Sequence, residues 1–252
     1  MPFRLLCVTA HPDDESGAFG GALLMAHRDG VETSLLCLTE GQAAHHRGDA
    51  ADGAELGRMR RAELSAACDV LGIGRCEILH YPDGALPQQN FYELAGVIAE
   101  RIRSVRPQVV LTFSGDGGVN LHRDHTIVSM ATTAAFHWAG RAEFFPEQLE
   151  RGLQPYAPQK LYYANTPFIN VRDRPELTQA PTVPYSLTLE LGDLANVKFA
   201  AFRKHSTQAG VLERVGDVIR KTLSMERYLL AAAPGHISTT NDTALFAGVT
   251  PD

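Results

Sequence analysis

Short apolar segments alternate with amphipathic ones over roughly the first 140 residues, and this alternation restricts the fold more than any other feature of the sequence. The apolar segments cover residues 3–10, 32–40, 75–81 and 108–113, and helical spacing of apolar residues covers 16–30, 55–73, 90–107 and a segment near 122–139. Buried strands that alternate with helices are typical of a parallel sheet with right-handed crossovers. We therefore expect an α/β fold with a Rossmann-like, doubly wound, mostly parallel sheet and helices on both faces.

The second half of the chain predicts further strands and closing helices. Residues 160–165 and 185–191 have the pattern of strands, and residues 193–206 and 217–233 have that of helices. No change of composition marks a linker, and neither an internal repeat nor a low-complexity tract is present. We expect residues 1–252 to form one domain.

Composition excludes several classes of function. The 23 basic and 29 acidic residues give a net charge of −6, and no stripe of Lys and Arg is available to bind the phosphates of a nucleic acid. No apolar run reaches the roughly 18–20 residues of a membrane span, and no secretory signal precedes the first strand. Cys7, Cys37, Cys68 and Cys76 form no CxxC pair and are expected to be buried thiols. These features predict a cytoplasmic protein with a small-molecule substrate, and a homo-oligomer is compatible with them.

Acidic and imidazole side chains follow the predicted strands. "HPDDE" at residues 11–15 comes directly after the first strand, "PDG" at 82–84 follows the third, and "SGDGGVNLHRDH" at 114–125 follows the fourth. The carboxyl ends of parallel strands meet at one rim, where ligands bind in open α/β sheets. The glycines after the first strand do not form GxGxxG, and the acidic residues would repel a pyrophosphate, so this rim suits a cation better than a dinucleotide.

Four residues have the chemistry and spacing of metal ligands. His11 and Asp14 are three residues apart, as are His122 and His125 at the start of a predicted helix. A catalytic zinc ion takes about three protein ligands and keeps one position for water, so any three of these four residues could form the set. One histidine and Asp13 then remain for proton transfer, which is the arrangement that metal-assisted hydrolysis needs.

Two motifs resemble those of a known family. "AHPDDE" at 10–15 together with "HRDH" at 122–125 is similar to the LmbE-like, or PIG-L, superfamily of zinc-dependent N-acetylglucosamine deacetylases, which includes the deacetylases of mycothiol and bacillithiol precursors. Segments 60–72, 81–86 and 198–208 match further family segments in the expected order. The resemblance therefore spans nearly the whole chain.

The resemblance implies roles for the residues that match the motifs. It implies one zinc ion per chain, held by His11, Asp14 and His125, with iron as the alternative ion in the cell. Asp13 matches the general base, and His122 matches the general acid or oxyanion-binding histidine. The expected reaction is removal of the N-acetyl group from an N-acetylglucosaminyl conjugate.

Other matching positions concern the substrate and the second motif. Asp124 is expected to orient the catalytic histidine, and Arg60 and Asp83 are expected to bind sugar hydroxyls through charged hydrogen bonds. Two positions depart from the family pattern: Arg123 stands where a proline is usual, and Asn120 stands where several members have a tyrosine.

The residues leave alternative functions open. An amidase acting on a thiol conjugate would use the same chemistry, and a sugar-binding or metal-binding module without catalysis would need the ligands but not Asp13 and His122. A phosphoesterase generally needs two metal ions, and the sequence supplies ligands for one. The loops at 41–54 and 141–158 are expected to select the aglycone, and His205 receives no role.

Overall fold

The structure is a computed structural model that describes residues 2–164, 185–211, 224–235 and 242–251. Within these residues a seven-stranded sheet has the order β3-β2-β1-β4-β5-β7-β6. Its strands are β1 (Arg4–Thr9), β2 (Glu32–Thr39), β3 (Arg75–Tyr81), β4 (Val109–Phe113), β5 (Lys160–Ala164), β6 (Leu187–Glu190) and β7 (Met225–Ala232). The strands β1 to β5 pair in parallel, whereas β7 pairs antiparallel with both β5 and β6. The predicted mostly parallel α/β sheet is confirmed.

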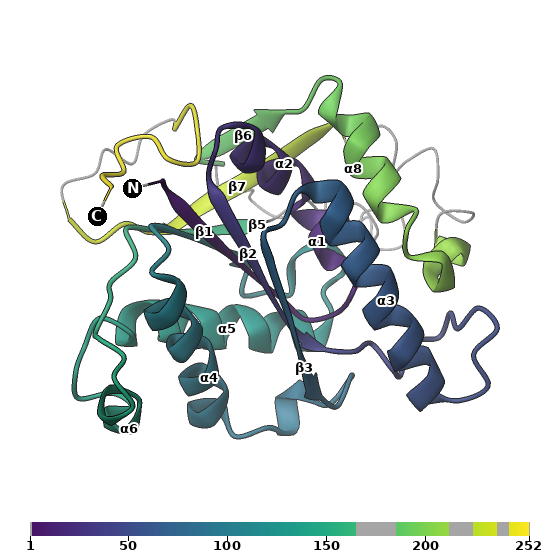
Figure 1. The fold of residues 1–252 in the computed structure, drawn as a ribbon, viewed down its shortest axis with the longest axis horizontal. Coiled ribbons are helices and arrows are strands. Elements are labelled where there is room, and N and C mark those ends of the chain that lie inside the picture. Colours follow the sequence, from purple (N-terminus) through teal and green to yellow (C-terminus); the bar gives the residue numbers. More distant parts are fainter. Residues whose placement is uncertain (1, 165–184, 212–223, 236–241, 252) are drawn as a thin grey trace.

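Helices cover both faces of the sheet, as predicted. They are α1 (Asp14–Ala18), α2 (Gly20–Arg28), α3 (Gly53–Leu71), α4 (Phe91–Val105), α5 (Arg123–Trp138), α6 (Pro146–Glu150) and α8 (Leu194–Phe202). Figure 1 shows α4 and α5 on one face, and α1, α2, α3 and α8 on the other. Because both faces are covered, the central strand β4 (VVLTF) is buried at all five residues.

Strand order positions the functional residues. β1 lies between β2 and β4, so the chain runs outward from β1 in both directions, first through β2 and β3 and later through β4 and β5. The crevice at such a reversal, outside the carboxyl ends of the strands, is where open α/β sheets bind ligands. The segments that leave β1 and β4, residues 10–14 and 114–125, therefore meet there although about a hundred residues separate them.

The helix predicted over residues 16–30 is divided in two. α1 ends at Ala18 and α2 begins at Gly20, with Phe19 in a non-helical conformation between them. The Glu226 carboxylate lies at the start of α2, where a Cβ on Gly21 would be 2.8 Å from its carboxyl carbon. The missing side chain lets that carboxylate accept hydrogen bonds from the backbone N–H groups of Gly21 (2.6 Å) and Ala22 (2.8 Å) at the start of α2. An anion at a helix N-terminus is electrostatically favourable.

The helix predicted over residues 217–233 is wrong where the structure describes it. Residues 225–232 form β7, and residues 217–223 lie outside the described residues. "MERYLLAA" is rich in helix formers, but Glu226 and Tyr228 alternate with exposed Arg227, and the segment pairs on both sides with strands. Tertiary pairing outweighs the local propensity here.

Two other expectations need correction. Residues 141–158 precede β5 and pack at the amino ends of the strands, where Gln159 and Lys160 donate backbone hydrogen bonds to Gln108, so this loop lies opposite the crevice. Cys76 is exposed on the edge strand β3, whereas the other three cysteines are buried as expected. Among the described residues, none of the helices combines the length and the apolar character needed to span a bilayer.

Candidate metal centre and active site

Three side chains from β1, α1 and α5 converge at the crevice. His11 follows β1, Asp14 opens α1, and His125 lies in the first turn of α5. The Nδ1 atom of His11 is 3.2 Å from the Nε2 atom of His125 and 3.6 Å from Asp14 Oδ2. The Nε2 atom of His125 is 3.2 Å from Asp14 Oδ1. The three groups therefore form a compact triangle of nitrogen and oxygen atoms, and all three side chains are nearly inaccessible to solvent.

The outer nitrogen of each imidazole has an acceptor. His11 Nε2 lies 3.1 Å from Asp83 Oδ1 and 3.3 Å from Asp124 Oδ2, and His125 Nδ1 lies 3.1 Å from the carbonyl oxygen of Gly117. These acceptors favour a proton on the outer nitrogen and leave the inner one with a free lone pair. Metal-binding histidines generally donate their second N–H to a carboxylate or a carbonyl in this way.

Packing fixes the plane of the His125 ring. Phe113, the last residue of β4, stacks on it with centroids 3.9 Å apart and an interplanar angle of 3°. Gly117 approaches closely because it has no side chain: a Cβ there would lie 2.8 Å from the carbonyl oxygen of His122. The glycine-rich segment thus lets the backbone reach the site, as the sequence suggests.

Charge at the triangle is strongly negative. Burial disfavours a charged imidazole, but the carboxylates of Asp124, Asp14 and Asp83 outweigh burial and raise the pKa of His11 well above its usual value. Burial likewise opposes ionisation of Asp14, yet the neighbouring imidazoles of His125 and His11 hold its pKa well below the usual range. Asp14 Oδ2 also accepts backbone hydrogen bonds from Ala10 (3.1 Å) and His11 (2.8 Å). The arrangement of charges favours a cation at this point.

Asp13 has a strained backbone. Its φ of 112° lies in the left-handed region, which costs a residue other than glycine about 1–3 kcal/mol and is most common at functional sites. Its backbone N–H donates to Glu15 Oε2 (2.9 Å), and its Oδ2 accepts from Arg60 Nη2 (3.0 Å). Burial raises the pKa of Asp13 to about 6, against the opposing charge of Arg60. A carboxylate with a pKa near neutrality is suited to accept a proton.

His122 stands beside the triangle as the N-cap of α5. Its Nδ1 accepts from the backbone N–H of Asp124 (3.2 Å), so a neutral ring carries its proton on Nε2. Burial, followed by the imidazoles of His11 and His125, lowers the pKa of His122. Its ring meets that of His11 edge-on, with centroids 4.7 Å apart. Asn120 accepts from the His122 backbone N–H (3.1 Å), and both Asn120 and Arg123 are exposed.

The carboxylate of Asp124 has different partners from those expected. It does not orient His122 by a hydrogen bond among the described residues. Instead Asp124 accepts backbone hydrogen bonds from Gly84 (2.7 Å) and Leu86 (3.2 Å) and lies against His11. Asp124 has these partners because it lies in the first turn of α5. There its backbone N–H donates to the capping residue His122, while its side chain points to the loop after β3. Asp124 therefore connects that loop to His11.

Asp83 and Arg60, the expected substrate-binding residues, are largely shielded from solvent and make hydrogen bonds within the protein. Asp83, with 8% of its side chain exposed, contacts His11 and accepts from the backbone N–H of Ala43 (2.9 Å). Arg60 is 2% exposed, and its guanidinium donates to Gly41, Pro12 and Asp13. Both side chains form hydrogen bonds with loops that border the His11, Asp14 and His125 triangle.

The third acid of the opening motif points away from the triangle. Glu15 is fully buried and lies 2.7 Å from His205 Nε2, a residue 190 positions later that sequence reasoning left without a role. The "STQ" segment after His205 is fixed in the same region: Ser206 and Thr207 donate to Glu63, and Gln208 donates to the His46 carbonyl. A run of polar side chains at a helix end was the only signal for this anchor.

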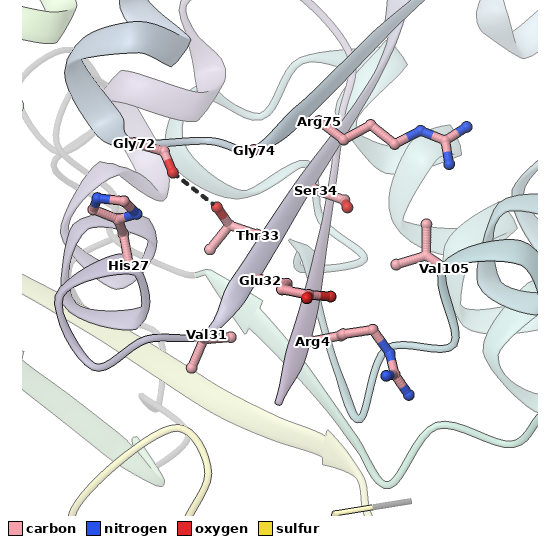
Figure 2. A pocket seen from close by; sticks show the side chains of 10 residues that line it. All are labelled: Arg4, His27, Val31, Glu32, Thr33, Ser34, Gly72, Gly74, Arg75 and Val105. Carbon is pink, nitrogen blue, oxygen red and sulfur yellow. Dashed lines mark hydrogen bonds between the residues drawn. The ribbon is translucent and has the colours of Figure 1, made fainter. Parts of the chain in front are cut away.

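A cavity of about 450 Å³ lies at the amino-terminal ends of the strands, on the opposite side of the sheet from the crevice. Figure 2 shows its charged lining, which includes Arg4, Glu32 and Arg75, the first residues of β1, β2 and β3. It contains neither the acids nor the imidazoles described above. The cavity is thus separate from the crevice that contains His11, Asp14 and His125.

Comparison with known proteins identifies relatives. The sequence pattern of the PIG-L family, described as GlcNAc-PI de-N-acetylase, matches residues 6–136. A 1D-myo-inositol 2-acetamido-2-deoxy-alpha-D-glucopyranoside deacetylase from Rhodococcus erythropolis is 30% identical over 91% of each chain. A mycothiol S-conjugate amidase from Streptomyces coelicolor is 32% identical over 64% of this chain and 60% of its own length. The solved structure of N,N'-diacetylchitobiose deacetylase from Pyrococcus horikoshii shares the fold with a TM-score of 0.75, covering 98% of this chain and 86% of that one at 22% identity.

Proposed function

The chain belongs to the PIG-L family of de-N-acetylases, and we propose that it is a metal-dependent hydrolase that removes the acetyl group from the amine of an N-acetylglucosaminyl conjugate. The proposal combines three supports: the family, the curated relatives that act on N-acetylglucosaminyl compounds, and the chemistry of the crevice. The products are acetate and a free amino sugar.

The triangle of His11, Asp14 and His125 carries the proposal. Ligand atoms at about 2.0–2.2 Å from a tetrahedral zinc ion lie about 3.3–3.5 Å apart, and the two imidazole nitrogens, 3.2 Å apart, fit this spacing. Asp14 approaches them with a different oxygen each, Oδ2 to His11 (3.6 Å) and Oδ1 to His125 (3.2 Å), so its carboxylate borders both nitrogens. Nitrogen donors at that spacing without a cation would repel or compete for a proton. The donor set of two imidazoles and a carboxylate suits zinc, and it suits iron as well.

Two groups that take one ligand atom from each of three described residues have all three atoms within 4.8 Å of one another, and neither contains Asp14: His11 with His122 and His125, and His11 with Asp83 and Asp124. The first group would leave the Asp14 carboxylate unused although it is 3.2 Å from His125 Nε2. The second group would require the outer nitrogen of His11, and it excludes His125. We therefore assign the ion to the Asp14-centred triangle.

A zinc ion held there would polarise the acetamide carbonyl and favour ionisation of a water molecule. Asp13 accepts the proton of the attacking water, because its carboxylate is buried and has a pKa near neutrality. His122 presents its Nε2–H as a hydrogen-bond donor to the oxygen that gains negative charge. The proton that Asp13 takes from the water passes to the departing amine, which returns Asp13 to its carboxylate form. Asp83 and Asp124 keep the His11 ring in the tautomer that the ion needs.

Amine release from N-acetylglucosaminides, measured with metal content on the same samples, tests the proposal. Asp13→Asn should keep about one ion per chain and lose about 10²–10⁴-fold in kcat, the usual contribution of a general base. His122→Ala should likewise keep the ion and lose turnover. If His122→Ala loses the ion, the ligand assignment is wrong, and if Asp13→Asn keeps full turnover, another group is the base.

An amidase acting on a thiol conjugate is the second candidate. The 32% identity to a mycothiol S-conjugate amidase favours it, since hydrolysis of either amide needs the same groups. The substrate panel should therefore include mycothiol S-conjugates beside simple N-acetylglucosaminides. A preference for S-conjugates by more than about tenfold in kcat/KM would favour the amidase.

A further inference from the structure

Two cysteines lie on either side of the connection between α3 and β3. Cys68 is in the last turn of α3 and is 3% exposed, whereas Cys76 is the second residue of the edge strand β3 and is exposed. Figure 1 shows the chain leaving α3 and turning directly into β3. A short connection therefore joins a buried thiol to an exposed one.

Hydrogen bonds and a glycine fix this connection. The carbonyl oxygen of Cys68 accepts from the backbone N–H of Ile73 (3.0 Å). The hydroxyl of Thr33, on β2, donates to the carbonyl oxygen of Gly72 (3.2 Å), a contact drawn in Figure 2. Gly72 has φ at +69°, and a Cβ there would lie 2.5 Å from atoms of a histidine ring on α2, so only glycine fits. The turn is thus held both to its own helix and to the neighbouring strand.

The register of β2 and β3 directs the Cys76 side chain toward α3. Cys76 pairs with Leu35, and paired residues on neighbouring strands face the same side of a sheet. Leu35 comes two residues after Thr33 and faces the same side as Thr33, whose hydroxyl contacts the end of α3. Cys68 lies on the buried side of that helix, and its thiol donates a hydrogen bond to the Cys76 sulfur. The two sulfur atoms are therefore in direct contact.

The cysteines differ in their capacity to react. The hydrogen bond from Cys68 lowers the pKa of Cys76 although burial opposes this, and the same bond raises the pKa of Cys68. Cys7 and Cys37 are fully buried, and burial raises the pKa of both thiols well above the usual value. Because the thiolate is the nucleophilic form, Cys76 is the cysteine that a reagent from solvent meets first.

We propose that Cys76 and Cys68 form a peroxide-reactive pair that closes to a reversible disulfide, with Cys76 as the attacking thiolate and Cys68 as the resolving thiol. Redox-sensitive cysteines are typically accessible and lie beside a second thiol in this way. An S–S bond is about 2.05 Å long, so two sulfur atoms already in contact need a shift of only about 1–2 Å. The edge strand β3, which pairs on one side only, can supply it.

The reaction has two steps. The Cys76 thiolate attacks one oxygen of hydrogen peroxide: an S–O bond forms, the O–O bond breaks, and the hydroxide that leaves takes up a proton to become water. The Cys68 sulfur then attacks the sulfur of the Cys76 sulfenic acid: the S–S bond forms, the S–O bond breaks, and hydroxide leaves with the Cys68 proton as a second water. The two thiols lose two electrons, and one peroxide molecule gains them.

Tryptic peptides resolve the product, because each of the four cysteines lies in a different one. Cleavage after Arg61 and Arg75 gives peptide 62–75 with Cys68 and peptide 76–101 with Cys76. After about one equivalent of hydrogen peroxide, mass spectrometry without reduction should find these two peptides joined, with the mass of two hydrogen atoms lost. The thiol count of the denatured protein should fall from four to two per chain, and dithiothreitol should restore it.

Three variants assign the roles. Cys68→Ser should stop at the sulfenic acid of Cys76, which dimedone should trap at least about tenfold more than in the unmodified protein. Cys76→Ser should keep its remaining thiols after the same treatment. Cys37→Ala, the matched control from the neighbouring strand, should form the disulfide as the unmodified protein does. Where Cys68→Ser does not fold, Cys68→Ala gives the same comparison.

Other products would overturn the proposal. A bond between peptide 76–101 and the peptide of Cys37, or a disulfide between two chains on a non-reducing gel, would assign Cys76 a different partner. Equal trapping by dimedone in Cys68→Ser and in the unmodified protein would exclude Cys68 as the resolving thiol, and a thiol count that stays at four would exclude the reaction. These readouts do not involve amine release, so failure here is distinct from failure of the proposed function.

Discussion

Removal of the Glu226 carboxylate should destabilise the protein far more than removal of its lysine partner. Glu226 and Lys198 are each 2% exposed, and their charged atoms are 2.5 Å apart. The carboxylate also accepts from the Tyr228 hydroxyl (2.6 Å) and from the backbone N–H groups of Gly21 and Ala22. Four donors from three elements therefore depend on one acceptor.

Because Glu226 has four donors and Lys198 has one acceptor among the described residues, the two substitutions should lower the free energy of unfolding by different amounts. Glu226→Ala leaves a buried ammonium group without a counter-charge, which alone costs about 3–5 kcal/mol. Lys198→Met leaves a carboxylate that still has three donors, two of them at a helix N-terminus, so the loss is that of one charged hydrogen bond, about 2 kcal/mol. The double variant Lys198→Met with Glu226→Gln should be more stable than Glu226→Ala, since it leaves no buried charge.

Guanidinium denaturation followed by circular dichroism measures these differences. The samples should contain a chelator, because an ion that binds only the folded state would add to the apparent stability. Glu190→Ala, an exposed acid on β6, is the matched control and should change the free energy of unfolding by less than about 0.5 kcal/mol. Equal losses for Glu226→Ala and Lys198→Met would refute the reasoning, as would a loss below about 1 kcal/mol for Glu226→Ala.

Three further predictions follow from contacts away from that pair. Cys76 is exposed, and a hydrogen bond with the Cys68 thiol lowers its pKa despite partial burial, so iodoacetamide should modify Cys76 before the other cysteines. The pH at which its modification rate is half-maximal should lie below the usual value of about 8.5 and should rise in Cys68→Ala. Peptide mass spectrometry would show a different order of modification if the contact is absent. Glu63→Ala should cost about 3 kcal/mol in the same denaturation assay, because three donors of the "STQ" segment lose their acceptor, and a neutral result would contradict that anchor. Zinc added to chelator-treated protein should raise the melting temperature, and the free energy of unfolding should increase by about 2.7 kcal/mol at a free zinc concentration of 100 times Kd. Asp14→Ala should abolish this stabilisation. Stabilisation that persists in Asp14→Ala would place the ion elsewhere.

Much of the fold and of the candidate site follows from local patterns. The parallel strands are apolar runs of strand length between helical segments, and the strand-end rule brings His11, Asp14 and His125 to one rim before any coordinates are considered. Those residues belong to two short segments whose internal spacing already limits their geometry. Prediction succeeds here because each half of the centre is local.

Contacts that depend on distant partners could not be predicted. β7 has the composition of a helix, and only its pairing with β5 and β6 makes it a strand. Arg60 lies in "RMRR", which is typical of a solvated helix face, and its burial follows from the closeness of Gly41 and Asp13. Glu15 and His205 are 190 residues apart, and the sequence around either residue does not predict contact with the other.

The pairing of β1 with β4 has a consequence for how the protein would acquire the proposed ion. His11 and His125 are 114 residues apart, so no early, local folding unit contains both. In small zinc modules the ion nucleates folding from neighbouring ligands, whereas here it has no site until a long chain closure is complete. Ion capture should therefore be a late event whose rate reports formation of the sheet centre, and free zinc should leave the refolding rate itself unchanged.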